Sequence, residues 1–565
     1  MNTIDYQAER QKYLQAILDS DAQYKIIVAG PGTGKTFSFK KVLEHIGSSN
    51  NLVLTFINDL VNDLNKELSS MADVRTFHSF SKQALHKNLP DDLKSDFFLY
   101  PKINQIIEYD YRIVNENINN SKKYFEELDE NDGVISKFLK RGSYYNTIGF
   151  DDCVYRILKQ FESNHDNIPS YEIILIDEYQ DFNLLEVSLI DLLSTKSKTL
   201  IVGDDDQALY DQLKSAKADY LREKFISSLY KNFQLPFCSR CTEVIVTAVN
   251  NIVKTAQKKG MLTNRIHKSF ICYKPDKEID NTMYPYIKHI KCSIHTKKCP
   301  YIAKYIESEI NKISNDDIQD AKNNNIPCVL IVGPSHILKG INEYLLETGY
   351  IVESKNSLKN FSLIDSLGYL NCDIESNIGW RIIIEGKYLT YLDNIIKESF
   401  NKQFVNLVPQ KFKDEVGHIL SLYKKFLNNK LNLMEETEFV EYANLQIAEI
   451  KQHLFEGCIQ DDAEQLHVPN KDISIKITTF QGSKGLQSNH VFLVGLVNGI
   501  LPLNHREITD KEICQFIVGL TRARKQCQII SCQRIFGKIF KDSDFINWIG
   551  NNNINYKYVD KSYFN

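Results

Sequence analysis

Several features that mark particular classes of protein are missing from this sequence. No apolar run approaches the ~20 residues that a membrane-spanning helix needs. The N-terminal stretch MNTIDYQAERQKY is polar and charged, so we expect no signal peptide. Excess positive charge is also missing, because the net charge is −4 at pH 7. A nucleic-acid partner would therefore need a local basic channel. Because neither a signal peptide nor a membrane span is predicted, we expect a cytoplasmic protein with no membrane partner.

The ligand spacing of a zinc site is missing too. Cys238 and Cys241 form a C-x-x-C pair, but no second pair of Cys or His ligands follows at the usual distance. The 12 cysteines are scattered through the chain, which is typical of reduced thiols in a cytoplasm. With 565 residues, the chain is long enough for roughly three to five domains.

The clearest positive signal is the segment YKIIVAGPGTGKT, from Tyr24 to Thr36. An apolar run predicts a strand, a glycine-rich turn follows, and residues 35–45 are compatible with a helix. Backbone N–H groups of such a turn converge on an anion at the positive end of the helix. The expected nucleotide-binding residues of the loop are Ala29, Gly30, Pro31, Gly32, Thr33, Gly34, Lys35 and Thr36.

Two residues of this loop have specific chemical roles. Lys35 would reach the β- and γ-phosphates, and the Thr36 hydroxyl would ligate Mg²⁺. Ala29 stands where the strict pattern has glycine. The order of strand, loop and helix nevertheless favours nucleoside triphosphate binding over a glycine-rich turn without a ligand.

Two further apolar runs end in polar residues that suit phosphate chemistry. Residues 172–177, EIILID, predict a strand that ends in Asp177 and Glu178. Asp177 would hold Mg²⁺ together with Thr36, and Glu178 would orient and deprotonate the attacking water. Residues 199–203 predict another strand, and Gln207 after it could sense the γ-phosphate or position the attacking water. Strands alternating with helices, with ligands at the strand ends, indicate a parallel α/β domain.

One glutamine ahead of this domain has two interpretations. Gln11 lies in a predicted polar helix, and its amide could read an adenine edge because it both donates and accepts hydrogen bonds. A solvated helix face explains the same spacing equally well.

Eight motifs in order carry a family resemblance. GPGTGKT, LTFIND, TFHSF, DEYQD, GDDDQALY, SRCTEVI, ITTFQGSKGLQSNHVFLVGL and VGLTRARK resemble those of the UvrD/Rep-type superfamily 1 DNA helicases. They extend over most of the chain. The resemblance implies an α/β fold of two RecA-like P-loop lobes with parallel sheets, each carrying a mainly helical insert.

The resemblance also gives the expected order of domains. The first lobe would comprise residues 1–85 and 166–235, with its helical insert at 86–165. The second lobe would comprise residues 236–365 and 472–565, with its insert at 366–471. Apolar runs at 327–333, 491–496 and 526–531 supply strands for the second lobe.

Roles of individual second-lobe residues are implied by the same resemblance. Arg240 and Arg522 match arginines of the fourth and sixth motifs, and these would reach across to the γ-phosphate. Arginine suits this role because its planar fork binds phosphate oxygens and stays charged. Gly485 and Gln487 of the fifth motif would contact the nucleotide. The expected catalytic set is Lys35, Glu178, Gln207, Arg240 and Arg522.

The expected nucleic-acid contacts come from the ends of first-lobe strands: Thr55, Phe56, Asn58, Thr76, Phe77, His78 and Lys214. Residues 71–80 predict a strand edge followed by a loop. Aromatic and hydroxyl groups there could stack on bases and bond phosphates. Taken alone, Phe56 and Phe77 are better explained as core residues.

Several positions depart from the family pattern. Phe37 replaces an arginine that packs on adenine, and we expect it to bind the nucleotide because a phenyl ring can also stack on a base. Ser239 replaces an aromatic residue before Arg240. Gln487 replaces a glutamate. Lys214 lies in the region where the family usually has an arginine that contacts nucleic acid. We therefore expect hydrolysis to be retained and substrate handling to differ.

These observations predict an ATP-dependent helicase or translocase that moves 3′→5′ on single-stranded DNA, with ATP and Mg²⁺. Its partners would be single-stranded or tailed duplex DNA and a protein such as a nuclease or a repair or defence component. The alternative is a DNA-stimulated ATPase that senses nucleic acid and gates a partner without processive unwinding.

Overall fold

The structure is a computed structural model that describes residues 5–55, 58–95, 97–116, 118–210, 214–354, 360, 362–455 and 473–564. Contacts between residues divide the chain into two compact units. The first unit comprises Met1–Phe77, Ile168–Lys355 and Val468–Asn565, and the second comprises His78–Asn167 and Asn356–His467. Within the described residues, no helix has the length and apolar character needed to cross a membrane.

The first unit contains a sheet of six parallel strands in the order β3-β2-β6-β7-β1-β8. The strands are β1 (Tyr24–Ala29), β2 (Asn51–Thr55), β3 (Asp73–Thr76), β6 (Ile173–Ile176), β7 (Lys198–Gly203) and β8 (Lys231–Leu235). Central strands such as β6, IILI, are buried along their whole length, as expected for a sheet covered on both faces. Because β1, β6 and β7 are parallel, their carboxyl ends lie at the same edge of the sheet.

Among the described residues, the helices that accompany this sheet are α1 (Tyr6–Leu18), α2 (Lys35–Ile46), α3 (Asn58–Leu68), α9 (Leu184–Ser194) and α11 (Ala218–Ile226). Local sequence explains where some of them begin and end. Asn183 caps α9 by accepting from the Glu186 N–H, and Glu186 accepts in return from the Asn183 N–H. Gly47, with φ +68°, ends α2 in the left-handed conformation.

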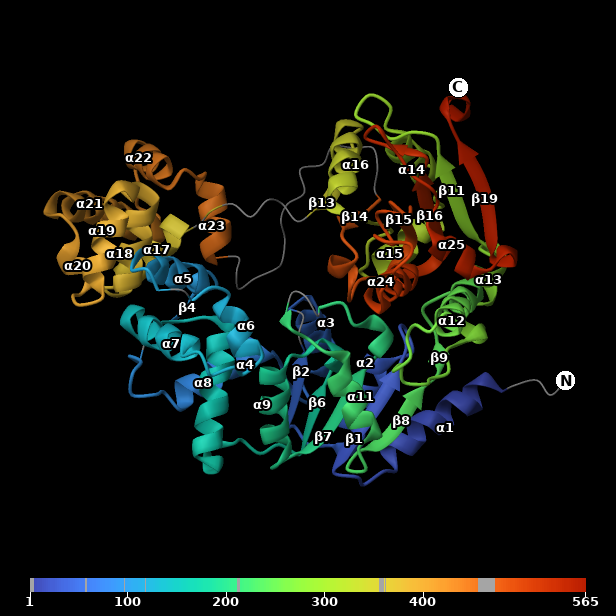
Figure 1. Ribbon diagram of the computed structural model, residues 1–565, viewed down its shortest axis with the longest axis horizontal. Coiled ribbons are helices and arrows are strands. Elements are labelled where there is room, and N and C mark those ends of the chain that lie inside the picture. The colour runs from blue at the N-terminus through green and yellow to red at the C-terminus, as the bar shows by residue number, and fades with distance from the viewer. Residues whose placement is uncertain are drawn as a thin grey trace. The chain divides into compact units, whose positions relative to one another are not determined.

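A second sheet of seven parallel strands, ordered β13-β14-β12-β15-β16-β11-β19, belongs to the same unit. Its strands are β11 (Ile287–Cys292), β12 (Val329–Val332), β13 (Val352–Ser354), β14 (Ile475–Thr478), β15 (Ser488–Val494), β16 (Ala523–Cys532) and β19 (Ile554–Val559). Alternate residues of β12 enter two different apolar clusters, so both faces of the sheet are covered. Figure 1 shows strands from distant parts of the chain side by side in this sheet.

The helices associated with the second sheet are α12 (Glu243–Lys258), α13 (Glu278–Met283), α14 (Tyr301–Ile310), α15 (Asn315–Asn323), α16 (Ser335–Glu347), α24 (Asp510–Leu520) and α25 (Asp544–Ile549). A short parallel pair, β9 (Phe237–Cys238) and β10 (Ile271–Cys272), aligns Cys238 with Cys272. Hairpin strands β17 (Arg534–Ile535) and β18 (Lys538–Ile539) follow β16.

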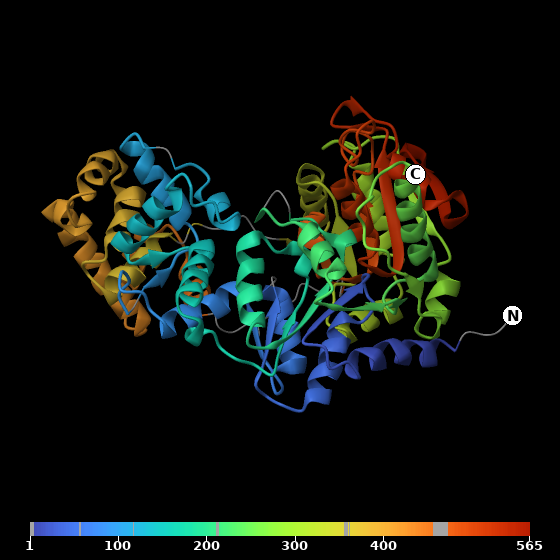
Figure 2. The same cartoon turned by 60° about the horizontal axis from the view of Figure 1, so that its bottom comes forward.

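The second unit is mainly helical and is built from two distant segments of the chain. The first supplies α4 (Phe77–Lys87), α5 (Ile103–Ile113), α6 (Ser121–Glu126), α7 (Val134–Tyr145) and α8 (Phe150–Ser163), with short strands β4 (Phe98–Leu99) and β5 (Thr147–Ile148). The second supplies α17 (Ser362–Cys372), α18 (Asn377–Lys387), α19 (Leu389–Ser399), α20 (Phe404–Leu407), α21 (Gln410–Leu427), α22 (Leu433–Ala443) and α23 (Ile447–Phe455). Figures 1 and 2 both show helices of the two segments packed together.

A buried charge network joins the two segments of this unit. The Asp110 carboxylate is fully buried, and it accepts from Arg141 at 2.7 Å and from Arg381 at 3.1 Å. Arg141 also donates to the Ser399 hydroxyl at 2.7 Å. Because each buried charge has a partner, the network fixes how the segments pack.

The structure confirms the predicted α/β class with two parallel sheets, and the predicted strands are present in both. Of the strand edge and loop predicted at 71–80, the strand is present as β3, but the loop is wrong because α4 begins at Phe77 directly after β3. Phe77 is buried, and the centre of its ring lies 4.8 Å from that of Phe182. This apolar contact holds the first residue of α4 in the core. The described residues of the two expected inserts, at 86–165 and 366–455, fall in the second unit, and the six-segment division remains a proposal.

Candidate nucleotide-binding site

The glycine-rich loop between β1 and α2 is held in a conformation that needs glycine. Gly32 and Gly34 have φ values of +70° and +91°. A Cβ atom on Gly32 would lie 2.3 Å from the Arg240 Cβ, so only glycine allows this close approach. Ala29 is still part of β1, where it pairs with Leu235 and is buried, and this position therefore does not require glycine.

An acidic pair lies opposite this loop, at the end of β6. Lys35 Nζ is 3.3 Å from Glu178 Oε1, and Lys484 Nζ is 3.7 Å from Glu178 Oε2. Asp177 accepts from the Glu178 N–H at 2.9 Å. Glu178 has φ +54°, a left-handed conformation that is uncommon outside glycine and is often found at functional sites.

The two carboxyl groups differ in their electrostatics. Burial raises the pKa of Asp177 to about 7, and the charge of Glu178 adds to this effect. Burial also acts to raise the pKa of Glu178, but the ammonium groups of Lys35 and Lys484 outweigh it, and the net effect is a lowered pKa. The two lysines therefore favour the charged form of Glu178, whereas burial disfavours the charged form of Asp177.

Gln207 and Arg522 meet at the end of β7. The Gln207 amide donates to Asp204 Oδ2 at 2.7 Å, and its oxygen accepts from Arg522 Nη2 at 3.0 Å. Arg522 also donates to the Leu486 and Val518 carbonyls. Burial and the nearby charge of Arg240 lower the pKa of Arg522 to about 9, which still leaves it charged at neutral pH.

These groups line one cleft of about 320 Å³ that receives residues from both sheets of the first unit. Twelve of the predicted nucleotide-site residues line it: Pro31, Gly32, Gly34, Lys35, Thr36, Asp177, Glu178, Gln207, Arg240, Gly485, Gln487 and Arg522. Residues that the sequence places more than 300 positions apart therefore meet around a space next to the phosphate-binding loop. Thr36 and Asp177 supply a hydroxyl and a carboxylate, the oxygen ligands that Mg²⁺ prefers.

A second hollow, of about 290 Å³, is also lined by Gly34. Gln11, Thr33 and Phe37 line it, as do Arg10 and Tyr273, which the sequence did not indicate. The Arg10 guanidinium carbon is 4.8 Å from the centre of the Tyr273 ring and 5.9 Å from that of Phe37. Flat rings, a cation and an amide beside a phosphate-binding loop suit a purine base.

The residues expected to contact nucleic acid are mostly covered. The side chains of Thr55, Thr76 and Phe77 are buried, and Phe77 packs in the core as the alternative interpretation held. Lys214 Nζ lies 2.6 Å from Glu186 Oε1, so a phosphate contact would require this ion pair to open. His78 packs at 4.8 Å from the Phe150 ring. Phe56 and the side chain of Asn58 lie outside the described residues.

Some site residues were missed by sequence reasoning. Asn324 and Arg524 line the cleft, and Lys484 reaches it through its contact with Glu178. Lys484 lies inside the GSKGLQ motif next to Gly485, so the motif itself could have indicated it. Nothing local marks Tyr273, because only the pairing of β9 with β10 brings it to the hollow.

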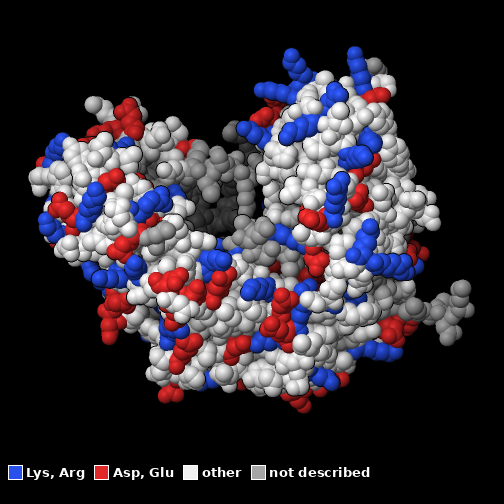
Figure 3. All heavy atoms as spheres, viewed as in Figure 1, with Lys and Arg blue, Asp and Glu red and all other residues white. Residues whose placement is uncertain are grey.

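The surface agrees with the absence of an overall basic charge. Figure 3 shows Lys and Arg side chains interspersed with Asp and Glu over most of the visible face. Nucleic acid would therefore be held by local contacts, as the composition indicated.

Comparison with known proteins identifies the family. The family model described as UvrD-like helicase C-terminal domain matches residues 155–534, and one described as AAA domain matches residues 14–212. The chain belongs to the UvrD-like helicases. The resemblance seen in the motifs is thereby confirmed, as is the expectation of an ATP-hydrolysing helicase at the level of the family.

Relatives of this UvrD-like chain are similar over nearly its whole length. A probable DNA helicase II homolog of Mycoplasma capricolum is 23% identical, over 93% of this chain and 84% of the relative. The ATP-dependent DNA helicase Rep of Buchnera aphidicola from Acyrthosiphon pisum is 23% identical, over 90% and 92%. The ATP-dependent DNA helicase PcrA of Staphylococcus epidermidis is 22% identical, over 91% and 82%.

Proposed function

We propose that this UvrD-like protein is an ATP-driven translocase that moves 3′→5′ on single-stranded DNA and separates tailed duplexes. The observation that carries the proposal is the shared cleft, in which the loop lysine, the acidic pair and two arginines from the far part of the chain meet. Such a cleft senses the γ-phosphate from two sides, so hydrolysis can be coupled to a change between the two sheets.

The chemistry can be assigned to residues of the cleft. Thr36 and Asp177 would hold Mg²⁺, which supplies charge compensation on phosphate oxygens. Glu178 takes the proton of the attacking water, and Arg240 and Arg522 stabilise the charge that develops on the transferred phosphoryl group. Because Lys35 contacts Glu178 at 3.3 Å, drawing Lys35 toward phosphates would make Glu178 a better proton acceptor.

The second hollow supports a base-binding role for residues outside the motifs. Arg10 supplies a cation beside Phe37, at a site where the family arginine is missing from the chain. Tyr273 supplies an aromatic ring for stacking on the base, in place of the family's aromatic residue that Ser239 replaces. Together with the Gln11 amide, which donates and accepts, these groups fit the edge and the faces of adenine.

A strand-displacement assay on duplexes with a 3′ or a 5′ tail tests the proposal. Unwinding of the 3′-tailed duplex alone, with ATP and Mg²⁺, is expected. Unwinding from the 5′ tail would refute the proposed direction. DNA-stimulated hydrolysis without any unwinding would instead favour the sensor that gates a nuclease or another repair or defence partner.

A further inference from the structure

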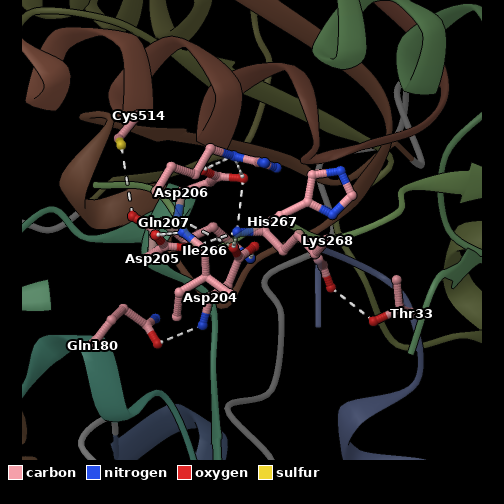
Figure 4. A network of polar contacts seen from close by, with 12 residues as sticks. Thr33, Gln180, Asp204, Asp205, Asp206, Gln207, Ile266, His267, Lys268 and Cys514 are labelled. Atoms are coloured by element: carbon pink, nitrogen blue, oxygen red, sulfur yellow. Dashed lines mark hydrogen bonds and ion pairs between the residues drawn. The ribbon is translucent and has the colours of Figure 1, made fainter. Parts of the chain in front are cut away.

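A buried cluster of charges lies directly before Gln207, and the nucleotide chemistry does not account for it. Asp204, Asp205 and Asp206 follow β7, and their carboxylates lie within 4.8 Å of one another. Lys268, in the segment between α12 and β10, places its ammonium 2.8 Å from Asp204, 2.6 Å from Asp205 and 2.9 Å from Asp206. Figure 4 shows this lysine among the three aspartates.

The three aspartates and Lys268 are buried, and two further cations face the carboxylates. Arg265 pairs with Asp206 at 2.7 Å, and Arg222 pairs with Asp205 at 3.2 Å. With Lys268, three cations therefore face three carboxylates. Burial alone would lower the pKa of Lys268, but the surrounding carboxylates outweigh it and raise the pKa, so the lysine is charged whenever the protein is folded.

Within the described residues of the cluster, Asp204 alone is hydrogen-bonded to the side chain of Gln207. Asp204 Oδ1 accepts from Lys268 and from the Asp206 N–H, and Oδ2 accepts from the Gln207 amide nitrogen. The Gln207 oxygen is then left to face Arg522 at 3.0 Å. The orientation of one amide, which has a donor end and an acceptor end, thus depends on Asp204 being an acceptor at both oxygens.

We propose that Lys268 is a positioning residue for hydrolysis: its ion pair with Asp204 Oδ1 fixes that carboxylate in place, and Asp204 Oδ2 orients the Gln207 amide so that its oxygen meets Arg522. This inference rests on the proposed function. The same segment also packs against the phosphate-binding loop, because a Cβ on Gly30 would lie 2.8 Å from the Phe270 ring. One short segment therefore contacts both the loop and the aspartates that precede Gln207.

Two isosteric variants separate positioning from simple charge balance. In Asp204→Asn, Lys268 can only donate, so it takes the Asn oxygen and turns the Asn NH₂ toward Gln207. The Gln207 amide must then rotate, and its NH₂ faces the Arg522 guanidinium, a donor against a donor. Asp205→Asn removes the same charge beside the same lysine but does not touch Gln207, and it is the matched control.

We expect Asp204→Asn to lower kcat for ATP hydrolysis by about tenfold or more, with KM changed less than about twofold. Asp205→Asn should keep kcat within about twofold of wild type. Both variants should bind a fluorescent ATP analogue with the affinity of wild type. Their melting temperatures should be similar to each other, because each variant removes one carboxylate charge beside Lys268. Equal effects of the two variants on kcat, or wild-type kcat in Asp204→Asn, would overturn the proposal.

The lysine itself is tested in a background that keeps the cluster neutral. Lys268→Met/Asp205→Asn removes one cation and one carboxylate, so the melting temperature should stay near that of Asp205→Asn while kcat falls about tenfold. If kcat recovers along with the melting temperature, Lys268 is only structural. Should this double variant fail to fold, the Asp204→Asn comparison still decides. A wild-type protein that hydrolyses no ATP would refute the proposed function instead.

Discussion

Arg522 is a buried cation without a carboxylate partner, and this has opposite consequences for activity and stability. Its guanidinium donates to two carbonyls, to Gln207 and to the Thr521 hydroxyl, and among the described residues no carboxylate lies within 4.0 Å of it. Burial and Arg240 lower its pKa from 12.5 to about 9. At ~1.4 kcal/mol per pH unit, keeping this charge costs the nucleotide-free protein at most about 5 kcal/mol.

We therefore expect Arg522→Met to slow hydrolysis without destabilising the fold. Loss of an arginine that stabilises transition-state charge should reduce kcat at least ~100-fold. Methionine fills most of the volume and removes the buried charge, at the expense of hydrogen bonds worth about 1 kcal/mol each. The free energy of unfolding, measured with urea, should be unchanged or higher by about 1–3 kcal/mol.

A matched arginine provides the control. Arg381 is also fully buried, but it pairs with Asp110 at 3.1 Å. Arg381→Met leaves that carboxylate with fewer partners and should lower the free energy of unfolding by about 3 kcal/mol. If Arg522→Met destabilised the protein as much as Arg381→Met does, the interpretation of Arg522 as an uncompensated charge would be refuted.

The remaining predictions concern proton transfer, base binding and pH. Glu178→Gln should bind ATP and hydrolyse almost none, and rapid turnover in that variant would exclude Glu178 as the base. Tyr273→Leu should raise the KM for ATP several-fold at constant kcat, whereas Tyr273→Phe should not; equal effects would exclude ring stacking. Burial lowers the pKa of His295 from 6.5 to about 4. Protons then bind preferentially to the unfolded chain below pH 6.5, so stability falls as the pH drops from 6.5 to 4. When the pH falls from 7 to 5, the free energy of unfolding, measured with urea, should fall by about 2 kcal/mol less in His295→Gln than in wild type. An equal fall in both proteins would contradict a lowered pKa of His295.

Local sequence was sufficient where one segment carries both the structure and the chemistry. The strand, loop and helix around Lys35 form a continuous pattern, and the apolar run before Asp177 predicts a buried strand with a carboxylate at its end. Parallel pairing then brings these ends together, which is why the cleft could be expected before its geometry was known.

Contacts set by distant strand pairing could not be predicted in the same way. Tyr273 reaches the base hollow because β10 pairs with β9, and Lys268 reaches the aspartates from the same segment. Neither residue belongs to a motif. Phe77 was ambiguous for another reason: an aromatic residue after a strand can face solvent or begin a helix, and its packing against Phe182 determines the outcome.

The most direct test of the account is steady-state ATP hydrolysis by the purified protein, with and without single-stranded DNA. Lys35→Ala, which removes the phosphate-binding lysine, is measured in parallel. We predict that single-stranded DNA strongly stimulates hydrolysis by the wild type and that Lys35→Ala shows none. Hydrolysis that DNA does not change, or that persists in Lys35→Ala, would contradict the claim that this cleft drives movement on DNA.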